Sequence, residues 1–171
     1  MPTLAQRLGE ISHYSVLLRR ARIIGFGTSR EFVQLAVARG CRHYSGIFPD
    51  LENDPGFDAI SNEELVALLL LGSNEFDGMA IRCAAQLTSR CDIKRLSDVA
   101  RRERVARPLA YIARAGSIHD PSRKDFWDKL TMLLGEQSPI SDGVLPHWSR
   151  FVSQTGVTRN GDGSVQWLHC Q

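Results

Sequence analysis

Residues 60–72, ISNEELVALLLLG, carry the signals for the start, the core and the end of one helix. Ser61 and Glu64 have the spacing of a capping box, in which each side chain bonds the backbone N–H of the other residue. Gly72 predicts the end of the helix, because glycine adopts the left-handed conformation that follows many helices without steric cost. The residues between them are apolar on every face, which is typical of a helix buried on all sides. We therefore expect a central helix surrounded by other elements.

Amphipathic segments on both sides of this helix predict further helices. Their apolar spacing and capping residues predict helices over residues 3–20, 30–39 and 73–89, and helices that start at Asp92, Pro108 and Asp120. Ser73 or Asn74 is the expected cap of the helix over 73–89. Gly116 is expected to end the helix that starts at Pro108, and Gly135 the helix that starts at Asp120. Short loops place successive helices antiparallel, as αα-hairpins. The expected fold is therefore mainly α, an irregular multi-helix bundle of short helices around a central buried helix.

The last part of the chain has a different character. Residues 136–145 have the composition of a linker, and residues 146–154 predict a short helix that carries Trp148. The sequence NGDG at residues 160–163 is a strong turn signal, and apolar residues alternate beside it at Val157, Val165 and Trp167. We expect a small C-terminal β-hairpin anchored by Trp167. The predicted organisation is a helical core domain over 1–135, with the linker, short helix and hairpin of 136–171 docked on it.

The composition is that of a globular protein. The chain has 171 residues, of which 43% are hydrophobic and 23% charged, and this length suits one domain. The N-terminal residues show no secretory signal pattern, and the longest apolar run is far shorter than the roughly 20 residues that cross a bilayer. These features predict a cytoplasmic protein with no membrane partner. The four cysteines are scattered and too few to staple the chain, so we expect free thiols.

Charge is strongly segregated along the chain. The net charge is +5 over residues 1–46, −8 over 47–80, +6 over 81–115 and −1 over the remainder, and 18 of the 21 basic residues are arginine. Arginine suits bidentate pairing with carboxylate or with phosphate. The basic segments therefore either pair internally with the acidic segment or bind an external anion, and both alternatives stay open here. Glu103 lies on an apolar helix face and needs a partner, either Arg107 or an arginine from another helix.

Catalytic patterns are weak. The five histidines are far apart, and neither a metalloprotease helix nor a serine elbow is present. The glycines of GFG at residues 25–27 lack the lysine of a Walker loop and the third glycine of a dinucleotide fold, so a joint between two helices explains them better. Cys41 or His43 with Asp50 or Asp54 would be the best enzymatic group, but solvated loop residues explain these four better. We predict no catalytic residue, cofactor or metal ligand, which favours a protein that is not an enzyme.

The function expected from the sequence is therefore a non-catalytic helical interaction module or adaptor that binds a protein partner. The alternative is an arginine-rich protein that binds nucleic acid, and an enzyme of unrecognised type is third. Assembly into a homo-oligomer stays open. The candidate binding surface consists of two arginine clusters and two tryptophans: Arg101, Arg102, Arg104, Arg107, Arg19, Arg20, Arg22, Trp148 and Trp167.

Overall fold

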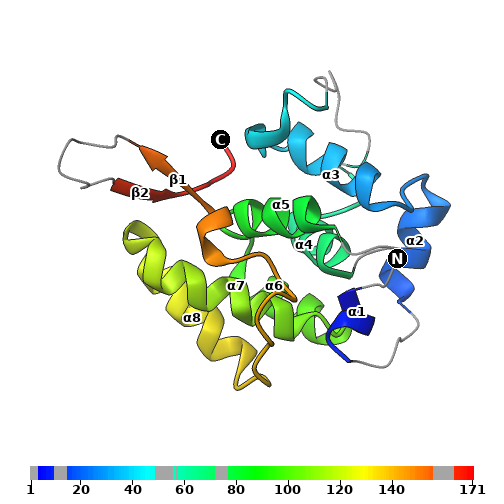
Figure 1. The fold of residues 1–171 in the computed structure, drawn as a ribbon. Coiled ribbons are helices and arrows are strands. Elements are labelled where there is room, and N and C mark those ends of the chain that lie inside the picture. Colours follow the sequence, from blue (N-terminus) through cyan, green and yellow to red (C-terminus); the bar gives the residue numbers. More distant parts are fainter. Residues whose placement is uncertain (1–3, 10–14, 49–55, 57, 72–76, 156–163) are drawn as a thin grey trace.

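The computed structural model describes residues 4–9, 15–48, 56, 58–71, 77–155 and 164–171. These residues form eight α-helices, three 3₁₀ turns and a two-stranded antiparallel sheet, which confirms the mainly α fold. The α-helices are α1 (Leu4–Arg7), α2 (Val16–Ile23), α3 (Ser29–Ala38), α4 (Asn62–Leu71), α5 (Gly78–Thr88), α6 (Ile93–Arg102), α7 (Ala106–His119) and α8 (Lys124–Leu134). The α4–α5 pair lies in the middle, with α3 on one side and α6, α7 and α8 on the other (Figure 1).

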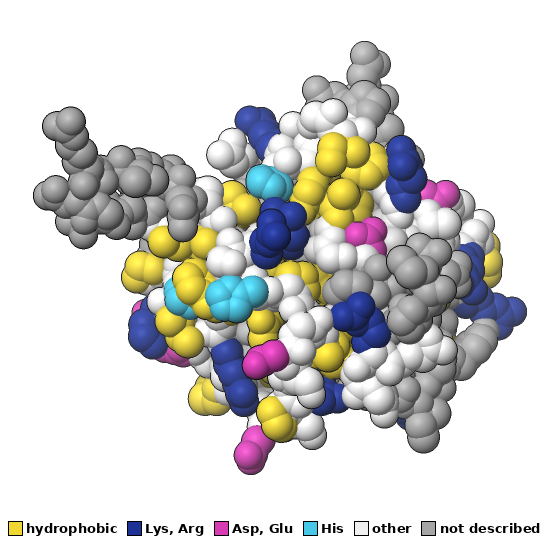
Figure 2. Space-filling model, viewed as in Figure 1, with side chains coloured by type: hydrophobic (Ala, Val, Ile, Leu, Met, Phe, Trp, Pro, Cys, Tyr) yellow, Lys and Arg dark blue, Asp and Glu magenta, His cyan; other side chains and the backbone are white. Residues whose placement is uncertain are grey.

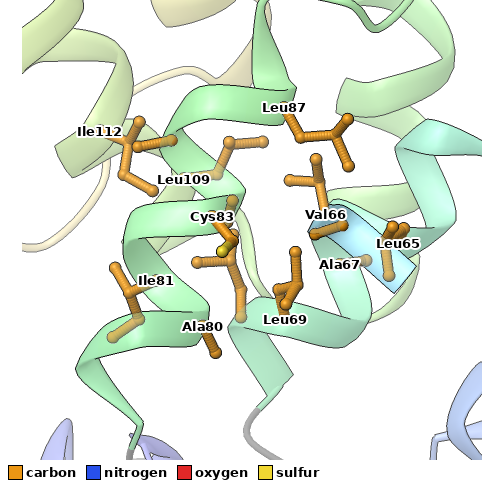
Figure 3. Packing of buried hydrophobic residues seen from close by; sticks show 14 of the residues in the cluster. Leu65, Val66, Ala67, Leu69, Ala80, Ile81, Cys83, Leu87, Leu109 and Ile112 are labelled. Atoms are coloured by element: carbon orange, nitrogen blue, oxygen red, sulfur yellow. The ribbon is translucent and has the colours of Figure 1, made fainter. Parts of the chain in front are cut away.

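Helix α4 is the buried centre that the sequence predicts. The Ser61 backbone N–H donates to Glu64 Oε2 at 3.0 Å, and the Glu64 N–H donates to Ser61 Oγ at 3.2 Å, so the capping box is formed. Every residue from Leu65 to Leu70 is buried. Figure 3 shows leucine, valine and alanine side chains of α4 packed beside those of α5 and α7. The predicted stop, Gly72, lies outside the described residues.

The N-terminal part corrects one prediction. A continuous helix over residues 3–20 is wrong, because α1 ends at Arg7 and α2 begins only at Val16. Gly9 has a φ of +69°, which a helix cannot continue through, and Ser15 caps α2 by accepting a 3.0 Å hydrogen bond from the Leu18 N–H. The next helix, α3, follows the sequence closely, because Thr28 and Glu31 form its capping box.

Further helix boundaries differ from the prediction. Helix α7 begins at Ala106 rather than at Pro108, and α8 begins at Lys124, after a 3₁₀ turn over Pro121–Arg123 that follows Asp120. Helix α5 is capped by Asp77, whose carboxylate accepts from the N–H groups of Met79 and Ala80, whereas residues 73 and 74 lie outside the described part. Gly116 does not end α7, which continues to His119. A Cβ atom at Gly116 would overlap the Trp127 indole, so this glycine permits close packing of α7 on α8. Asp92, in contrast, caps α6 as predicted.

The C-terminal segment contains the predicted hairpin. Strands β1 (Val152–Thr155) and β2 (Ser164–Trp167) pair antiparallel, with Val152 opposite Trp167. A short helix over 146–154 is wrong, because only Trp148–Arg150 forms a 3₁₀ turn and the strand starts two residues later. The turn residues 160–163 and Val157 lie outside the described residues. Trp167 packs against Trp127 and Phe151, with ring centroids 5.2 and 5.6 Å away.

None of the described helices is both long enough and apolar enough to cross a membrane.

Candidate functional site

One pocket brings together residues from three helices that are distant in sequence. Its volume is about 330 Å³. Helix α2 contributes an apolar wall and a basic side chain, α4 contributes an acid from its first turn, and the end of α6 contributes a base and an acid. The lining residues are Val16, Leu17, Arg20, Glu64, Arg102 and Glu103.

The C-terminal end of α6 places an acid inside the pocket. Glu103 follows the last residue of α6, and its side chain is only 3% exposed. Its Oε2 accepts a 2.7 Å hydrogen bond from Ser15 Oγ, and its Oε1 accepts from Arg102 Nε at 3.4 Å. Arg104 then takes a left-handed φ of 58°, which turns the chain from α6 into α7. The buried carboxylate thus has both a hydroxyl and a guanidinium partner, as a buried charge requires.

A second pair of opposite charges lies across the pocket. Arg20 Nη2 on α2 is 2.6 Å from Glu64 Oε2 at the start of α4. Partial burial raises the pKa of Glu64, but hydrogen bonds from Arg20 and from the Ser61 backbone outweigh it and hold the pKa below the ordinary 4.5. Glu64 therefore caps its own helix and also orients Arg20. Because the Arg20 side chain is half exposed, its remaining donors can meet a ligand at the mouth of the pocket.

The charges of the pocket balance, with two arginines against two glutamates. Among the described residues, its lining includes neither a serine nor a cysteine nor a histidine. Val16 and Leu17 supply apolar contact beside the guanidinium groups. Such a lining can bind a group that has both a carboxylate and an apolar part.

Next to the pocket, α2 presents an exposed stripe of two apolar and two basic residues. Val16 and Ile23 are 67% and 76% exposed. Residues at positions i, i+3, i+4 and i+7 share one helix face, so Arg19 and Arg20 lie between them. We call Val16, Arg19, Arg20 and Ile23 the α2 surface. It touches the pocket, because Val16 and Arg20 belong to both.

The structure brings the two predicted arginine clusters together, because Arg20 of the first and Arg102 of the second line one pocket. Other members are used within the fold. Arg107 donates to the carbonyl oxygens of Leu8, Ser138 and Pro139, which secures the segment after α8. Arg101 donates to the Leu133 carbonyl and lies 3.9 Å from Asp98. Arg19, Arg22 and Arg104 are exposed.

The two predicted tryptophans lie apart from these arginines. Trp148 is half-buried and stacks on His119, with ring centroids 3.7 Å apart and planes 11° from parallel. Burial, and then the neighbouring His147, lower the pKa of His119. Trp167 is only 2% exposed, so it packs inside the molecule rather than on a binding surface. Figure 2 shows histidine, basic and hydrophobic side chains near the middle of the face that includes α5 and the segment before β1.

A serine, a histidine and an aspartate also meet at the C-terminal tail. Ser89 Oγ lies 3.2 Å from His169 Nδ1, and His169 Nε2 lies 3.3 Å from Asp120 Oδ2. The order matches that of a hydrolase triad, but the Ser89 hydroxyl is buried and donates to the Gln86 carbonyl. The N–H groups of the next two residues bond the carbonyls of Leu87 and Thr88, so neither is left for an oxyanion. We interpret the contacts among Ser89, His169 and Asp120 as the attachment of the C-terminal tail to the helices.

Sequence reasoning missed Ser15 and Glu64 as parts of the site. Ser15 stands directly before the apolar and basic run VLLRR, which is the pattern of an N-cap, and the sequence pattern around Glu64 indicates only its capping box. Both serve a second partner that is far away in sequence. Among the described residues, no group of three or more histidines, cysteines and acids is placed to hold a metal ion. No protein-family model, curated protein or solved structure matches the chain.

Proposed function

We propose that this protein is a non-catalytic interaction module, and that the α2 surface with its pocket binds an acidic, amphipathic segment of a protein partner. The observation that carries the proposal is the exposure of Val16 and Ile23 on the same helix face as Arg19 and Arg20. Complete burial of one such aliphatic side chain contributes about 1.5–3 kcal/mol. A partner that covers both residues therefore gains the core of a small interface.

Charge decides which partner fits this stripe. Arg19 and Arg20 lie between the two apolar residues, so a covering segment with carboxylates within its apolar face would match the charge of this stripe. Within the described part of the chain, Arg102 donates a hydrogen bond only through Nε, to Glu103. Its side chain is 63% exposed, and its two terminal nitrogens are available to a carboxylate of the partner. The pocket and the α2 surface thus favour the same ligand, a segment that has both carboxylates and an apolar face.

Nucleic acid fits the same residues less well. Arg20 and Arg102 are paired with Glu64 and Glu103, and this pairing affects a carboxylate and a phosphate alike. The apolar residues separate the two ligands, because the exposed Val16 and Ile23 would gain nothing from a phosphate backbone. Nucleic acid stays the second candidate, because exposed arginines supply affinity that is independent of base sequence. The exposed arginines are Arg19, Arg22 and Arg104.

The test begins with a phage-displayed library of random peptides selected on the immobilised full chain. We expect selected peptides to combine Asp or Glu with Leu, Ile or Phe. Synthetic peptides are then titrated by fluorescence anisotropy against the wild type and against a Val16→Ser, Ile23→Ser double variant. The Kd should rise about tenfold or more in that variant, which corresponds to about 1.4 kcal/mol. Arg20→Glu should weaken binding to a similar degree.

Matched controls are provided by two apolar residues that are equally exposed elsewhere. Ile118 on α7 and Met132 on α8 are 72% and 73% exposed, and their change to serine should leave the Kd within about twofold. Peptides enriched in Lys or Arg, or peptides whose binding ignores the α2 variants, would contradict the proposal. Labelled single- and double-stranded oligonucleotides form the second arm. Binding that needs Arg19 and Arg22 and falls steeply with salt would favour nucleic acid instead.

A further inference from the structure

Two cysteines that are far apart in the sequence face one another in the core. Cys41 follows the turn after α3, and Cys170 lies in the tail after β2, 129 residues later. Their Sγ atoms are 2.8 Å apart. A disulfide bond is about 2.05 Å long, so a small movement of either side chain would bring the two sulfur atoms to bonding distance. The other two cysteines, Cys83 and Cys91, are also buried.

Backbone contacts hold both cysteines in this position. The Gln171 N–H donates to the Gly40 carbonyl at 3.2 Å, directly beside the two thiols. Gly40 has a φ of +104°, and a Cβ atom there would overlap the Gln171 carbonyl oxygen, so only glycine allows this approach. On the other side of Cys170, the Leu168 N–H donates to the Phe151 carbonyl at 2.9 Å. The facing of the two thiols is therefore built into the docking of the tail.

We propose that Cys41 and Cys170 form an oxidation site, at which a small peroxide converts the two thiols to an intramolecular disulfide. Cys41 is fully buried, whereas Cys170 is 9% exposed, so the peroxide reaches Cys170 first. The thiolate sulfur of Cys170 attacks one peroxide oxygen, the S–O bond forms, the O–O bond breaks and one water leaves. The product is a sulfenic acid.

Cys41 completes the reaction. Its thiolate sulfur attacks the sulfenic sulfur, the S–S bond forms, the S–O bond breaks and a second water leaves. The two thiols together lose two electrons and two protons, which reduce hydrogen peroxide to two waters. The neighbouring Cys41 thiol, and then burial, raise the pKa of Cys170. Because the thiolate is the reactive form, the reaction should accelerate as the pH rises.

The cross-link would close a loop that spans most of the chain. Closure of a loop of this length restricts the unfolded chain strongly. We expect the oxidised protein to have a Tm about 5–15 °C above that of the reduced protein. The bond would also attach the tail covalently to the turn after α3.

Peptide mapping tests the proposal directly. The full chain is exposed to stoichiometric hydrogen peroxide, alkylated with N-ethylmaleimide and digested with trypsin without reductant. Cleavage after Lys and Arg puts the four cysteines on separate peptides, 40–42, 83–90, 91–94 and 160–171. We expect a joined 40–42 and 160–171 species, lighter than the sum of its parts by two hydrogen atoms, as the main oxidised product. Reduction should restore both peptides.

Three single variants serve as controls. Cys170→Ser removes a thiol from the tail outside all helices and strands, and it should abolish the cross-link and the rise in Tm. Cys83→Ser and Cys91→Ser should each retain both. A different cysteine pair as the main product, oxidation of Cys170 to sulfinic acid without a cross-link, or four thiols still free after peroxide would each overturn the proposal.

Discussion

The indole Nε1 of Trp127 donates a 2.8 Å hydrogen bond to Oδ2 of Asp120, a carboxylate only 3% exposed. Ser122 Oγ donates to the other oxygen at 2.8 Å, and His169 Nε2 lies 3.3 Å from Oδ2. One buried acid thus connects the end of α7, helix α8 and the C-terminal tail.

Asp120→Ala should destabilise the fold by about 2–4 kcal/mol, because the buried Trp127 N–H would lose its acceptor. Urea unfolding measures the change. Asp125→Ala, which removes an exposed acid in the first turn of α8, is the control and should cost less than about 0.5 kcal/mol. Equal stability of the two variants would show that the network contributes nothing.

Gly116→Ala should destabilise the protein by about 1–3 kcal/mol, although alanine is the better helix former. The reason is that the new methyl group would overlap the Trp127 ring. Gly78→Ala at the start of α5 is the matched control, since its Cβ would make only an ordinary 3.8 Å contact with Pro146. Thermal unfolding of both variants checks the difference. A Tm for Gly116→Ala at or above the wild type would refute close packing at this site.

Ser15→Ala should cost about 2 kcal/mol, because one hydroxyl both caps α2 and donates to Glu103. Ser15→Thr retains a hydroxyl and should recover most of the loss. A double-mutant cycle with Glu103→Gln, followed by urea unfolding, separates the two roles. Strict additivity would mean that the Ser15–Glu103 hydrogen bond has no energetic weight.

The free energy of unfolding should depend on pH through Glu31, the partner of Thr28 in the capping box of α3. Hydrogen bonds from the backbone N–H groups of Gly27 and Thr28 hold the pKa of Glu31 below its ordinary value of 4.5. A lowered folded-state pKa means that the ionised carboxylate stabilises the fold above pH 4.5, and that this contribution disappears as the pH falls through the folded-state pKa.

The difference in unfolding free energy between the wild type and Glu31→Gln should therefore be largest near neutral pH and shrink below pH 4.5. Urea unfolding at a series of pH values measures it. Glu136→Gln, a change at an exposed acid after α8, is the control, and it should show no comparable trend. A Glu31→Gln difference that stays constant down to the acid limit would contradict the assignment.

The local sequence was enough to predict the helical class, the buried centre and the starts of α3, α4 and α6. The capping box at Ser61–Glu64 forms as predicted, Asp92 caps α6, and α3 begins with a capping box of Thr28 and Glu31. Each depends on residues three positions apart, so the chain contains all the required partners locally. The uninterrupted apolar run of α4 likewise has one solution in water, which is burial on all sides.

Contacts between side chains that are distant in sequence have no local signal and follow from tertiary packing. The sequence predicts a helix end at Gly116, but the role of this glycine depends on Trp127 of the next helix. The apolar pattern of the N-terminal residues likewise does not show the break between α1 and α2. The meeting of Arg20 with Arg102, and of Cys41 with Cys170, depends on how the helices and the tail pack. Hydrophobic burial is not directional, so a sequence pattern shows that a face is buried without showing which partner covers it.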